Sequence, residues 1–195
     1  PNTIELINDR FEIPEKFSTA KSDKFMYART GYTGEDGIEI MASNAEADSL
    51  ISFLIEKGIK PCGLGSRDTL RLEASLPLYG FELTEDITPV EASLNWTITN
   101  KNEYLGSNRI NDQLSGESHK VLKKFTINSR KIARTETVGI AGETKGLVTS
   151  GNFSPVLNKS IGFILFENMP SHDLIEFDIR GNLIEGNIVN KRFLS

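Results

Sequence analysis

The sequence of 195 residues predicts an α+β fold, with mixed helices and strands over residues 1–117 and an antiparallel β domain over residues 118–195. Two observations carry this prediction. In the first region, stretches with helical periodicity alternate with short extended runs. After about residue 118 the helical period disappears, and short alternating runs separated by turn residues replace it. We therefore expect a domain boundary between Gly116 and Lys120.

The first strands are expected to form a hairpin. Residues 1–23 are predicted to be a connector, because Asn, Asp and Pro interrupt any period, with residues 3–7 either a short strand or a short helix. Two β-like runs follow, at residues 25–30 and 38–41. The turn-forming sequence between them, which ends in Gly-Glu-Asp-Gly, joins them into a hairpin.

A helix is predicted over residues 45–57, where apolar residues recur on one side at helical spacing. Asn44 is its expected N-cap, and Gly58 its expected stop. Residues 59–63 are then expected to return as a strand. Strand, helix and strand beside a hairpin are typical of α+β layering.

A second helix is predicted over residues 66–76, with Ser66 as its N-cap and Arg67 as its first residue. Its leucines do not fall on one stripe, so we expect it to be buried on more than one side. Asp68 and Arg71 are three residues apart and are expected to pair, which is worth only ~0.2–0.5 kcal/mol.

The segment that follows alternates between loop and short elements. Residues 77–90 are rich in turn formers and are predicted to be a loop. Residues 93–99 alternate and predict a strand, in which Trp96 is expected to lie in the core because an indole buries a large area. A turn over residues 100–103 then leads to a short helix over residues 107–114.

The second region carries six short alternating runs. They lie at residues 122–127, 138–141, 146–149, 161–166, 174–179 and 184–189. Turn residues separate them, which is typical of a small β-barrel or sandwich.

Composition excludes several classes of protein. The net charge of −5 argues against a nucleic-acid binder that relies on a general basic field. No apolar run approaches the ~20 residues that a membrane-spanning helix needs, and the first residues lack a signal-peptide pattern. The single cysteine, Cys62, excludes an internal disulfide and is expected to be a buried structural thiol.

Several kinds of active site are also not expected. His119 and His172 lack nearby cysteines or carboxylates at zinc-binding spacing, so we predict no metal site. The sequence carries no nucleotide-binding glycine motif and no nucleophile elbow. The glycines of residues 31–37 accompany Glu35 and Asp36, which would repel a phosphate group.

Two polar residues stand out, and the first is Glu39. It lies between Ile38 and Ile40 in a β-like run, so the two isoleucines share one face and Glu39 takes the other. If both faces of the sheet are covered, Glu39 is a partly buried carboxylate that needs a partner. If one face is open, as antiparallel sheets often allow, the carboxylate is solvated. The pattern leaves both open.

The second is Arg67, a cation at the expected start of a helix, where the helix dipole disfavours positive charge by ~0.3–1 kcal/mol. Two interpretations are open. The guanidinium folds back onto a nearby carboxylate, or it forms an electropositive corner with the free N–H groups of the helix start and contacts a ligand.

Five stretches of the chain occur in the order and spacing of a known family. They are RTGYTGEDGIEI, CGLGSRDTLRLEA, LPLYGFELTEDITPVEASLNWTI, KNEYLG and TSGNFSPVLNKSIG. Together they resemble the T-protein of the glycine cleavage system, a tetrahydrofolate-dependent aminomethyltransferase. The likeness covers most of residues 27–166 and thins at both ends.

The resemblance implies part of a folate-binding α/β-sandwich followed by a C-terminal antiparallel β-barrel. It also implies that Glu39 and Arg67 contact folate and that Tyr32 lines the pocket, although the pattern fits a packed hairpin tyrosine equally well. The pterin of tetrahydrofolate presents its N3–H and 2-amino groups as a fork of donors, which a carboxylate matches with two parallel hydrogen bonds. Arg67 would donate to the pterin carbonyl or to a folate carboxylate.

The reaction that the resemblance implies moves an aminomethyl group from the lipoyl arm of a carrier, the H-protein, to tetrahydrofolate, with release of ammonia. The implied compartment is the cytoplasm of a bacterium or the mitochondrial matrix. Two alternatives remain, namely a folate-dependent demethylase and a non-catalytic folate-binding or structural module.

The family's T-proteins are much longer, and the motifs here resemble their C-terminal half. The chain also begins with Pro1 rather than Met. We therefore expect a fragment whose further partner is the missing N-terminal half of the same protein. That half carries the family's aspartate near the reacting folate nitrogens, so we assign no catalytic residue and expect the isolated chain to be inactive.

Overall fold

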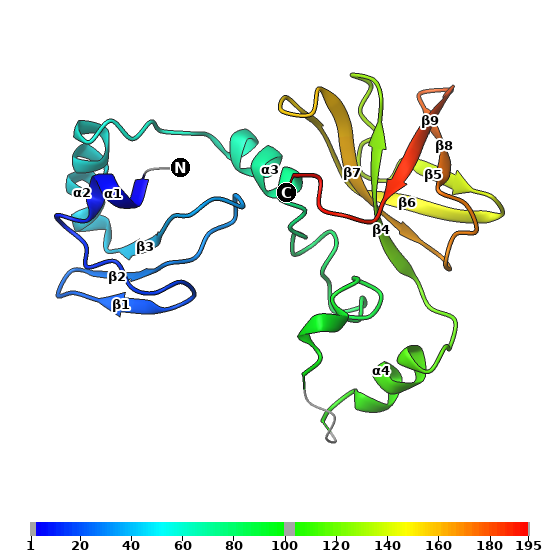
Figure 1. Ribbon diagram of the computed structural model, residues 1–195, viewed down its shortest axis with the longest axis horizontal. Coiled ribbons are helices and arrows are strands. Elements are labelled where there is room, and N and C mark those ends of the chain that lie inside the picture. Colours follow the sequence, from blue (N-terminus) through cyan, green and yellow to red (C-terminus); the bar gives the residue numbers. More distant parts are fainter. Residues whose placement is uncertain (1–2, 100–103, 195) are drawn as a thin grey trace. The chain divides into compact units, whose positions relative to one another are not determined.

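The computed structural model describes residues 3–99 and 104–194 (Figure 1). The chain divides into two compact units, residues 1–74 and residues 75–195. The turn predicted over residues 100–103 lies outside the described residues.

The first unit holds a three-stranded antiparallel sheet. Its strands are β1 (Thr19–Lys21), β2 (Phe25–Ala28) and β3 (Glu39–Ala42), in the order β1-β2-β3. The predicted hairpin is confirmed, since Ala28 of β2 pairs with Glu39 of β3. The third strand, β1, was not predicted, because it is only three residues long and lies in the segment expected to be a connector.

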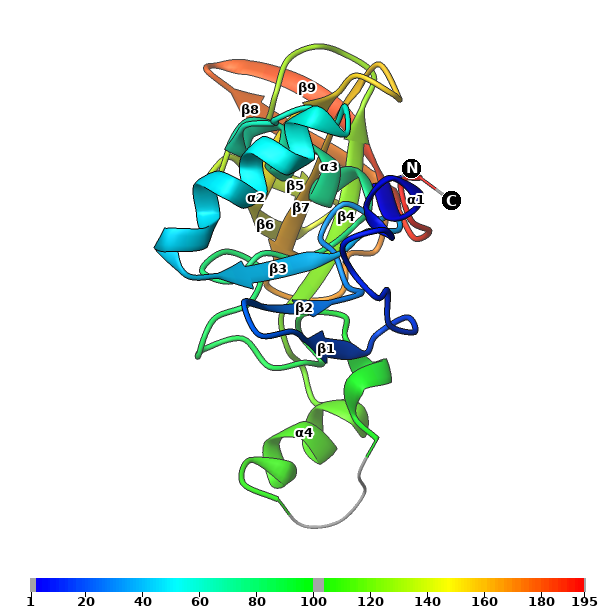
Figure 2. The same cartoon turned by 90° about the vertical axis from the view of Figure 1, so that its left-hand side faces the viewer.

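One face of this sheet is covered and the other is open. Helices α1 (Thr3–Ile7) and α2 (Asn44–Glu56) lie over the covered face (Figure 2). Phe25 and Tyr27 point into it and pack with Phe11, Ile7 of α1 and Leu50 of α2. The alternate positions of the hairpin, which include Glu39, face away from this core.

The helices of this unit differ in detail from the prediction. Helix α2 begins at Asn44 with Ser43 as its N-cap, whereas Gly58 ends it with φ of 78°, as expected. Helix α3 (Leu64–Glu73) begins earlier than predicted, with Gly63 as its N-cap. Ser66 is the third residue of the helix and therefore not its N-cap, and the Gly63 cap makes no side-chain hydrogen bond.

The strand predicted over residues 59–63 is wrong. The segment has no strand pairing, and most of it is exposed. Pro61 supplies no N–H for a ladder, which disfavours a paired strand here. Cys62 is likewise exposed rather than a buried thiol.

The second unit begins with irregular chain, the 3₁₀ turn η1 (Asn95–Thr97) and helix α4 (Ser107–Leu114). The loop predicted over residues 77–90 and the helix predicted over residues 107–114 are confirmed. The strand predicted over residues 93–99 is wrong. Ser93 has φ of 57°, and Thr97 N–H donates to the Leu94 carbonyl, so the chain turns where an extended run was expected. Trp96 is 78 % exposed and is not a core residue.

The rest of the unit is a closed six-stranded antiparallel barrel (Figure 1). Its strands are β4 (Val121–Ile127), β5 (Val138–Ala141), β6 (Thr144–Ser154), β7 (Lys159–Phe166), β8 (Leu174–Ile179) and β9 (Asn182–Val189). They follow the order β4-β7-β6-β5-β8-β9, and β9 pairs with β4 to close the barrel. The six predicted runs are confirmed as strands, and closure decides between barrel and sandwich.

The barrel core is aromatic and branched aliphatic. Phe125 and Phe177 are fully buried, with ring centres 4.6 Å apart, and Ile164 and Phe166 of β7 complete the packing. Interior-facing and exterior-facing side chains alternate along barrel strands, and in a small barrel the interior-facing ones fill the centre. Strand β6 is longer than predicted, because Gly151 and its polar neighbours lie in the strand rather than in a turn.

Candidate functional site

The loop between β2 and β3 carries Tyr32 and leads into β3 at Glu39, and an ion pair joins its two ends. The Arg29 guanidinium donates two hydrogen bonds to the Asp36 carboxylate, from Nε to Oδ1 at 3.2 Å and from Nη2 to Oδ2 at 2.7 Å. Arg29 also donates to the Pro14 carbonyl at 3.4 Å. The hydrogen bond from Arg29 lowers the pKa of the Asp36 carboxyl below its ordinary value, and its reciprocal effect raises the pKa of Arg29.

The tip of this loop meets the end of α3. Gly34 has φ of 79°, and a Cβ added to it would lie 2.8 Å from the Ala74 Cβ. A side chain at this position would therefore suffer both backbone strain and a collision. The glycine allows the loop to approach the residue that follows α3 directly.

Tyr32 and Arg67 are brought together by this arrangement. The Cζ atom of Arg67 lies 5.0 Å from the centre of the Tyr32 ring, which is within cation–π distance. Tyr32 is partly buried and Arg67 is exposed. An aromatic ring from the loop and a planar cation from the helix thus form one contact.

Arg67 is the fourth residue of α3, not the first as predicted. Its N–H donates to the Gly63 carbonyl at 3.3 Å, so the backbone donor at this position is used within the helix. Within the described ranges, its guanidinium makes no ion pair. The interpretation in which Arg67 folds back onto a carboxylate is therefore not what this structure contains.

The neighbouring carboxylate is already engaged by another arginine. Asp68 accepts from Arg71 through Nη2 at 2.8 Å and Nε at 2.9 Å, which confirms the predicted pair. Arg71 is buried, with 2 % of its surface exposed. This pairing leaves Arg67 as the exposed guanidinium of α3.

Glu39 is the first residue of β3 and is exposed, so the solvated alternative for its carboxylate describes this chain. Its Oε2 atom accepts a hydrogen bond from the Thr30 hydroxyl. Thr30 lies two residues before Tyr32 and is not among the site residues predicted from the sequence. Its position is the sequence signal that could have identified Thr30. It lies two residues after Ala28, the residue of β2 that pairs with Glu39.

The arrangement has defined chemical capabilities. Glu39 offers an ionised acceptor, which suits a ligand with paired N–H donors. Arg67 offers planar, forked donors, and the Tyr32 ring offers an apolar face. Among the described residues, no three His, Cys, Asp or Glu side chains gather as a metal site, and no helix is long and apolar enough to cross a membrane.

Comparison with known proteins identifies relatives over nearly the whole chain. The family profile described as "GCVT N-terminal domain" matches residues 14–102, and that described as "Glycine cleavage T-protein C-terminal barrel domain" matches residues 120–194. The aminomethyltransferase of Methylococcus capsulatus is 39 % identical over 181 residues, which cover 91 % of this chain and 50 % of the relative. That of Alcanivorax borkumensis is 45 % identical over 148 residues, 74 % of this chain and 41 % of the relative.

A solved structure gives the same result in three dimensions. The crystal structure of glycine cleavage system aminomethyltransferase T from Bartonella henselae superposes with a TM-score of 0.86 at 25 % sequence identity. The superposition covers 97 % of this chain and 56 % of that chain. The chain thus spans about half the length of the curated relatives that it matches.

Proposed function

The chain belongs to the glycine cleavage T-protein family, and from this we propose that it serves tetrahydrofolate-dependent aminomethyl transfer. The observation that carries the proposal is the contact between Tyr32 and Arg67, made by the same loop whose Thr30 holds Glu39. Three residue types suited to a flat heterocycle with donor and acceptor edges thereby come from one loop and the strand and helix beside it.

We assign each residue a role toward the folate. Glu39 accepts from the N3–H and the 2-amino group of the pterin, because its two oxygens match this fork. Arg67 donates to the pterin carbonyl or to a folate carboxylate. Tyr32 positions the guanidinium of Arg67 and lines the binding surface.

The proposed reaction takes an aminomethyl group from the lipoyl arm of a carrier protein, the H-protein. The carbon–sulfur bond of the arm breaks, the carbon joins two nitrogens of tetrahydrofolate as a methylene bridge, and ammonia leaves. The lipoyl arm is left as its dithiol, so no external oxidant or reductant is consumed. Within this chain, the residues proposed above bind and orient tetrahydrofolate, and none is assigned to the proton transfers.

Isothermal titration with tetrahydrofolate tests the binding part of the proposal. We expect saturable binding by the chain, and a loss of about tenfold or more in affinity when Glu39→Gln removes the charged acceptor. Glu35→Gln is the matched control, because Glu35 is an exposed glutamate of the same loop that is assigned no role. If both variants bind like the parent chain, Glu39 does not hold the pterin.

A turnover assay separates the proposed reaction from its alternatives. The chain is incubated with tetrahydrofolate and aminomethylated carrier protein, and methylene-tetrahydrofolate and ammonia are measured. Product from this donor, and none from a methylated amine or a sulfonium compound, supports aminomethyl transfer over demethylation. Folate binding without turnover of any donor assigns this chain a binding role, and absence of binding leaves a structural one.

A further inference from the structure

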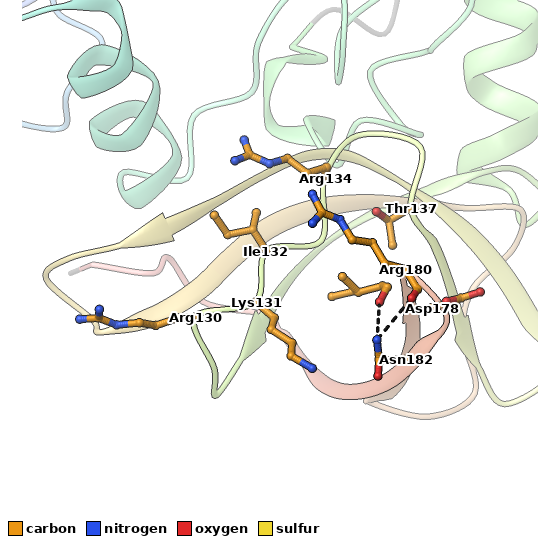
Figure 3. Close-up of a pocket in the computed structure, with 9 residues that line it drawn as sticks. Arg130, Lys131, Ile132, Arg134, Thr137, Asp178, Arg180 and Asn182 are labelled. Carbon is orange, nitrogen blue, oxygen red and sulfur yellow. Dashed lines mark hydrogen bonds between the residues drawn. The ribbon is translucent and has the colours of Figure 1, made fainter.

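One end of the barrel carries a pocket of about 390 Å³ whose charge is opposite to that of the chain as a whole (Figure 3). The loop between β4 and β5 and the turn between β8 and β9 form it. Four cations line it, Arg130, Lys131, Arg134 and Arg180, together with one carboxylate, Asp178. Since the whole chain carries a net charge of −5, this concentration of positive charge is a local feature.

Asp178, the one carboxylate in the pocket lining, offsets only part of the positive charge of the four cations. Within residues 3–99 and 104–194, none of the four cations forms an ion pair. Asp178 accepts from the Gly181 N–H at 2.8 Å and so also serves the turn. The Cζ atom of Arg130 lies 5.3 Å from the centre of the Phe153 ring, a cation–π contact that leaves the guanidinium charged. Like charges gathered in this way favour an anion between them.

The β4–β5 loop is held rigidly against the barrel. The Thr137 N–H donates to the Arg134 carbonyl at 3.0 Å, and the Thr137 carbonyl accepts from Val148 N–H at 2.9 Å. Ala133 is fully buried, and its carbonyl lies where a Cβ on Gly151 would stand, at 1.8 Å. The backbone that carries Arg134 is therefore ordered before any ligand arrives, which lowers the entropy cost of binding.

The β8–β9 turn places Arg180 at a position that suits other residues better. Arg180 has φ of 56° and Gly181 has φ of 78°, the left-handed pair of a two-residue hairpin turn. Asn or Asp is strongly preferred at the first of these positions, so an arginine here is conformationally unfavourable. In Figure 3 its side chain points from the turn toward Arg134. Backbone strain of this kind is concentrated at functional sites, and here it places a guanidinium at a positively charged pocket.

We propose that this pocket binds a small organic oxyanion that carries at least two negative charges on phosphate or carboxylate groups. The planar forks of Arg134 and Arg180 match either group with paired hydrogen bonds. Ile132 and Ile179 supply apolar wall, and the volume falls in the range of small-molecule sites, ~300–1,000 Å³, which leaves room for an organic part. All the residues involved lie in the barrel unit, so this inference is independent of the proposed folate site.

The test uses the whole chain and two defined probes, inorganic pyrophosphate for phosphate and citrate for carboxylate, at constant ionic strength. Titration is followed by calorimetry and by amide NMR spectra. We expect saturable binding of at least one probe, with shifts concentrated in residues 129–137 and 178–182. The tighter probe identifies the class of anion.

Paired variants separate the pocket from general electrostatics. Arg134→Gln with Arg180→Gln should weaken binding at least about tenfold, the effect of losing one good charge-assisted contact or more. Lys159→Gln with Lys191→Gln removes the same charge from exposed positions of the same unit outside the pocket, and should change affinity less than about twofold. Equal losses in the two pairs would overturn the proposal, as would the absence of saturable binding for both probes.

A single variant guards against a folding artefact. Arg180→Asn introduces the residue that the turn prefers, so we expect the melting temperature to rise while anion binding weakens by about tenfold. A stable Arg180→Asn chain that binds the preferred probe as tightly as the parent would remove Arg180 from the site and contradict the proposal.

Discussion

The guanidinium of Arg67 lies over the ring of Tyr32, with 5.0 Å between the Cζ atom and the ring centre. The contact joins the β2–β3 loop to helix α3, two segments that the sequence separates by a whole helix. At an exposed site such a contact is worth ~0.5–1 kcal/mol. Its importance therefore lies in orientation more than in stability.

Arg67→Lys should weaken tetrahydrofolate binding more than its retained charge suggests. Lysine keeps the positive charge but loses the planar fork of donors and the flat surface that stacks on Tyr32. We expect a loss of about tenfold in affinity by calorimetry, which corresponds to ~1.4 kcal/mol.

The matched control for this change is Arg10→Lys. Arg10 also lies over an aromatic ring, that of Phe53, with 4.6 Å from its Cζ atom to the ring centre. It has no assigned role toward folate, so affinity should stay within about twofold of the parent. Equal affinities for the parent chain and Arg67→Lys would argue that Arg67 does not donate to the ligand.

The ion pair between Arg29 and Asp36 should make stability depend on pH in the acid range. Arg29 lowers the pKa of Asp36 below its ordinary value of 3.8 in the folded chain. The stabilisation is therefore fully present above that ordinary value and is lost as the pH falls through the lower, folded pKa. Denaturant unfolding of the parent and Asp36→Asn should show a difference at neutral pH that shrinks below pH 3.8.

The double variant Arg29→Gln with Asp36→Asn completes a cycle for this pair. The coupling energy between the two positions isolates their interaction from the separate effects of each change. It should be favourable at neutral pH and vanish at the acid end. A coupling that persists unchanged in acid would mean that the charged form of Asp36 is not what Arg29 stabilises.

Gly151→Ala should destabilise the barrel strongly. A Cβ at this position would lie 1.8 Å from the Ala133 carbonyl oxygen, and a backbone atom cannot yield as a side-chain tip can. We expect a loss of roughly 3 kcal/mol or more in the free energy of unfolding, measured with denaturant.

The control is a glycine with free space. Gly65 lies in α3, and a Cβ added to it meets no atom within 4 Å. Gly65→Ala should therefore be neutral or stabilise by up to about 1 kcal/mol, because alanine favours the helix. If Gly151→Ala proves as harmless as Gly65→Ala, the close approach of the β4–β5 loop to β6 does not occur.

Phe177→Ala should remove a central part of the barrel core. The side chain is fully buried against Phe125, and truncation leaves a cavity that the rigid barrel cannot close. Loss of ~3–5 kcal/mol in the free energy of unfolding is expected from thermal or denaturant melts. Leu183→Ala, on a side chain that is 75 % exposed, should change it by less than about 0.5 kcal/mol.

Part of the candidate site was within reach of the sequence and part was not. The hairpin, and with it the outward direction of Glu39, followed from the alternation of residues 38–40 and the turn before them. The start of α3 did not, because Gly63 caps it without any side chain and so leaves no recognisable capping residue. As a result, Arg67 was predicted to be the first residue of the helix, whereas it is the fourth.

The same limit applies to Trp96 and Cys62. Burial was predicted for Trp96 because an indole buries a large area and for Cys62 because it lies in a mostly apolar run, and both are exposed in the structure. Local pattern gives the period of a segment, but whether a surface is covered depends on which distant segment lies on it. The alternating run at residues 93–99 met no partner strand, so it turned instead.

By itself, the sequence determined the α+β class, the six strands of the second unit and the family to which the chain belongs, because these rest on periodicity and local motif. Only the tertiary structure decided that β9 pairs with β4 to close a barrel, that Tyr32 meets Arg67, and that four cations gather around one pocket. Each of these joins residues far apart along the chain. The free energy that brings them together comes from burial of the two cores, and no local pattern encodes it.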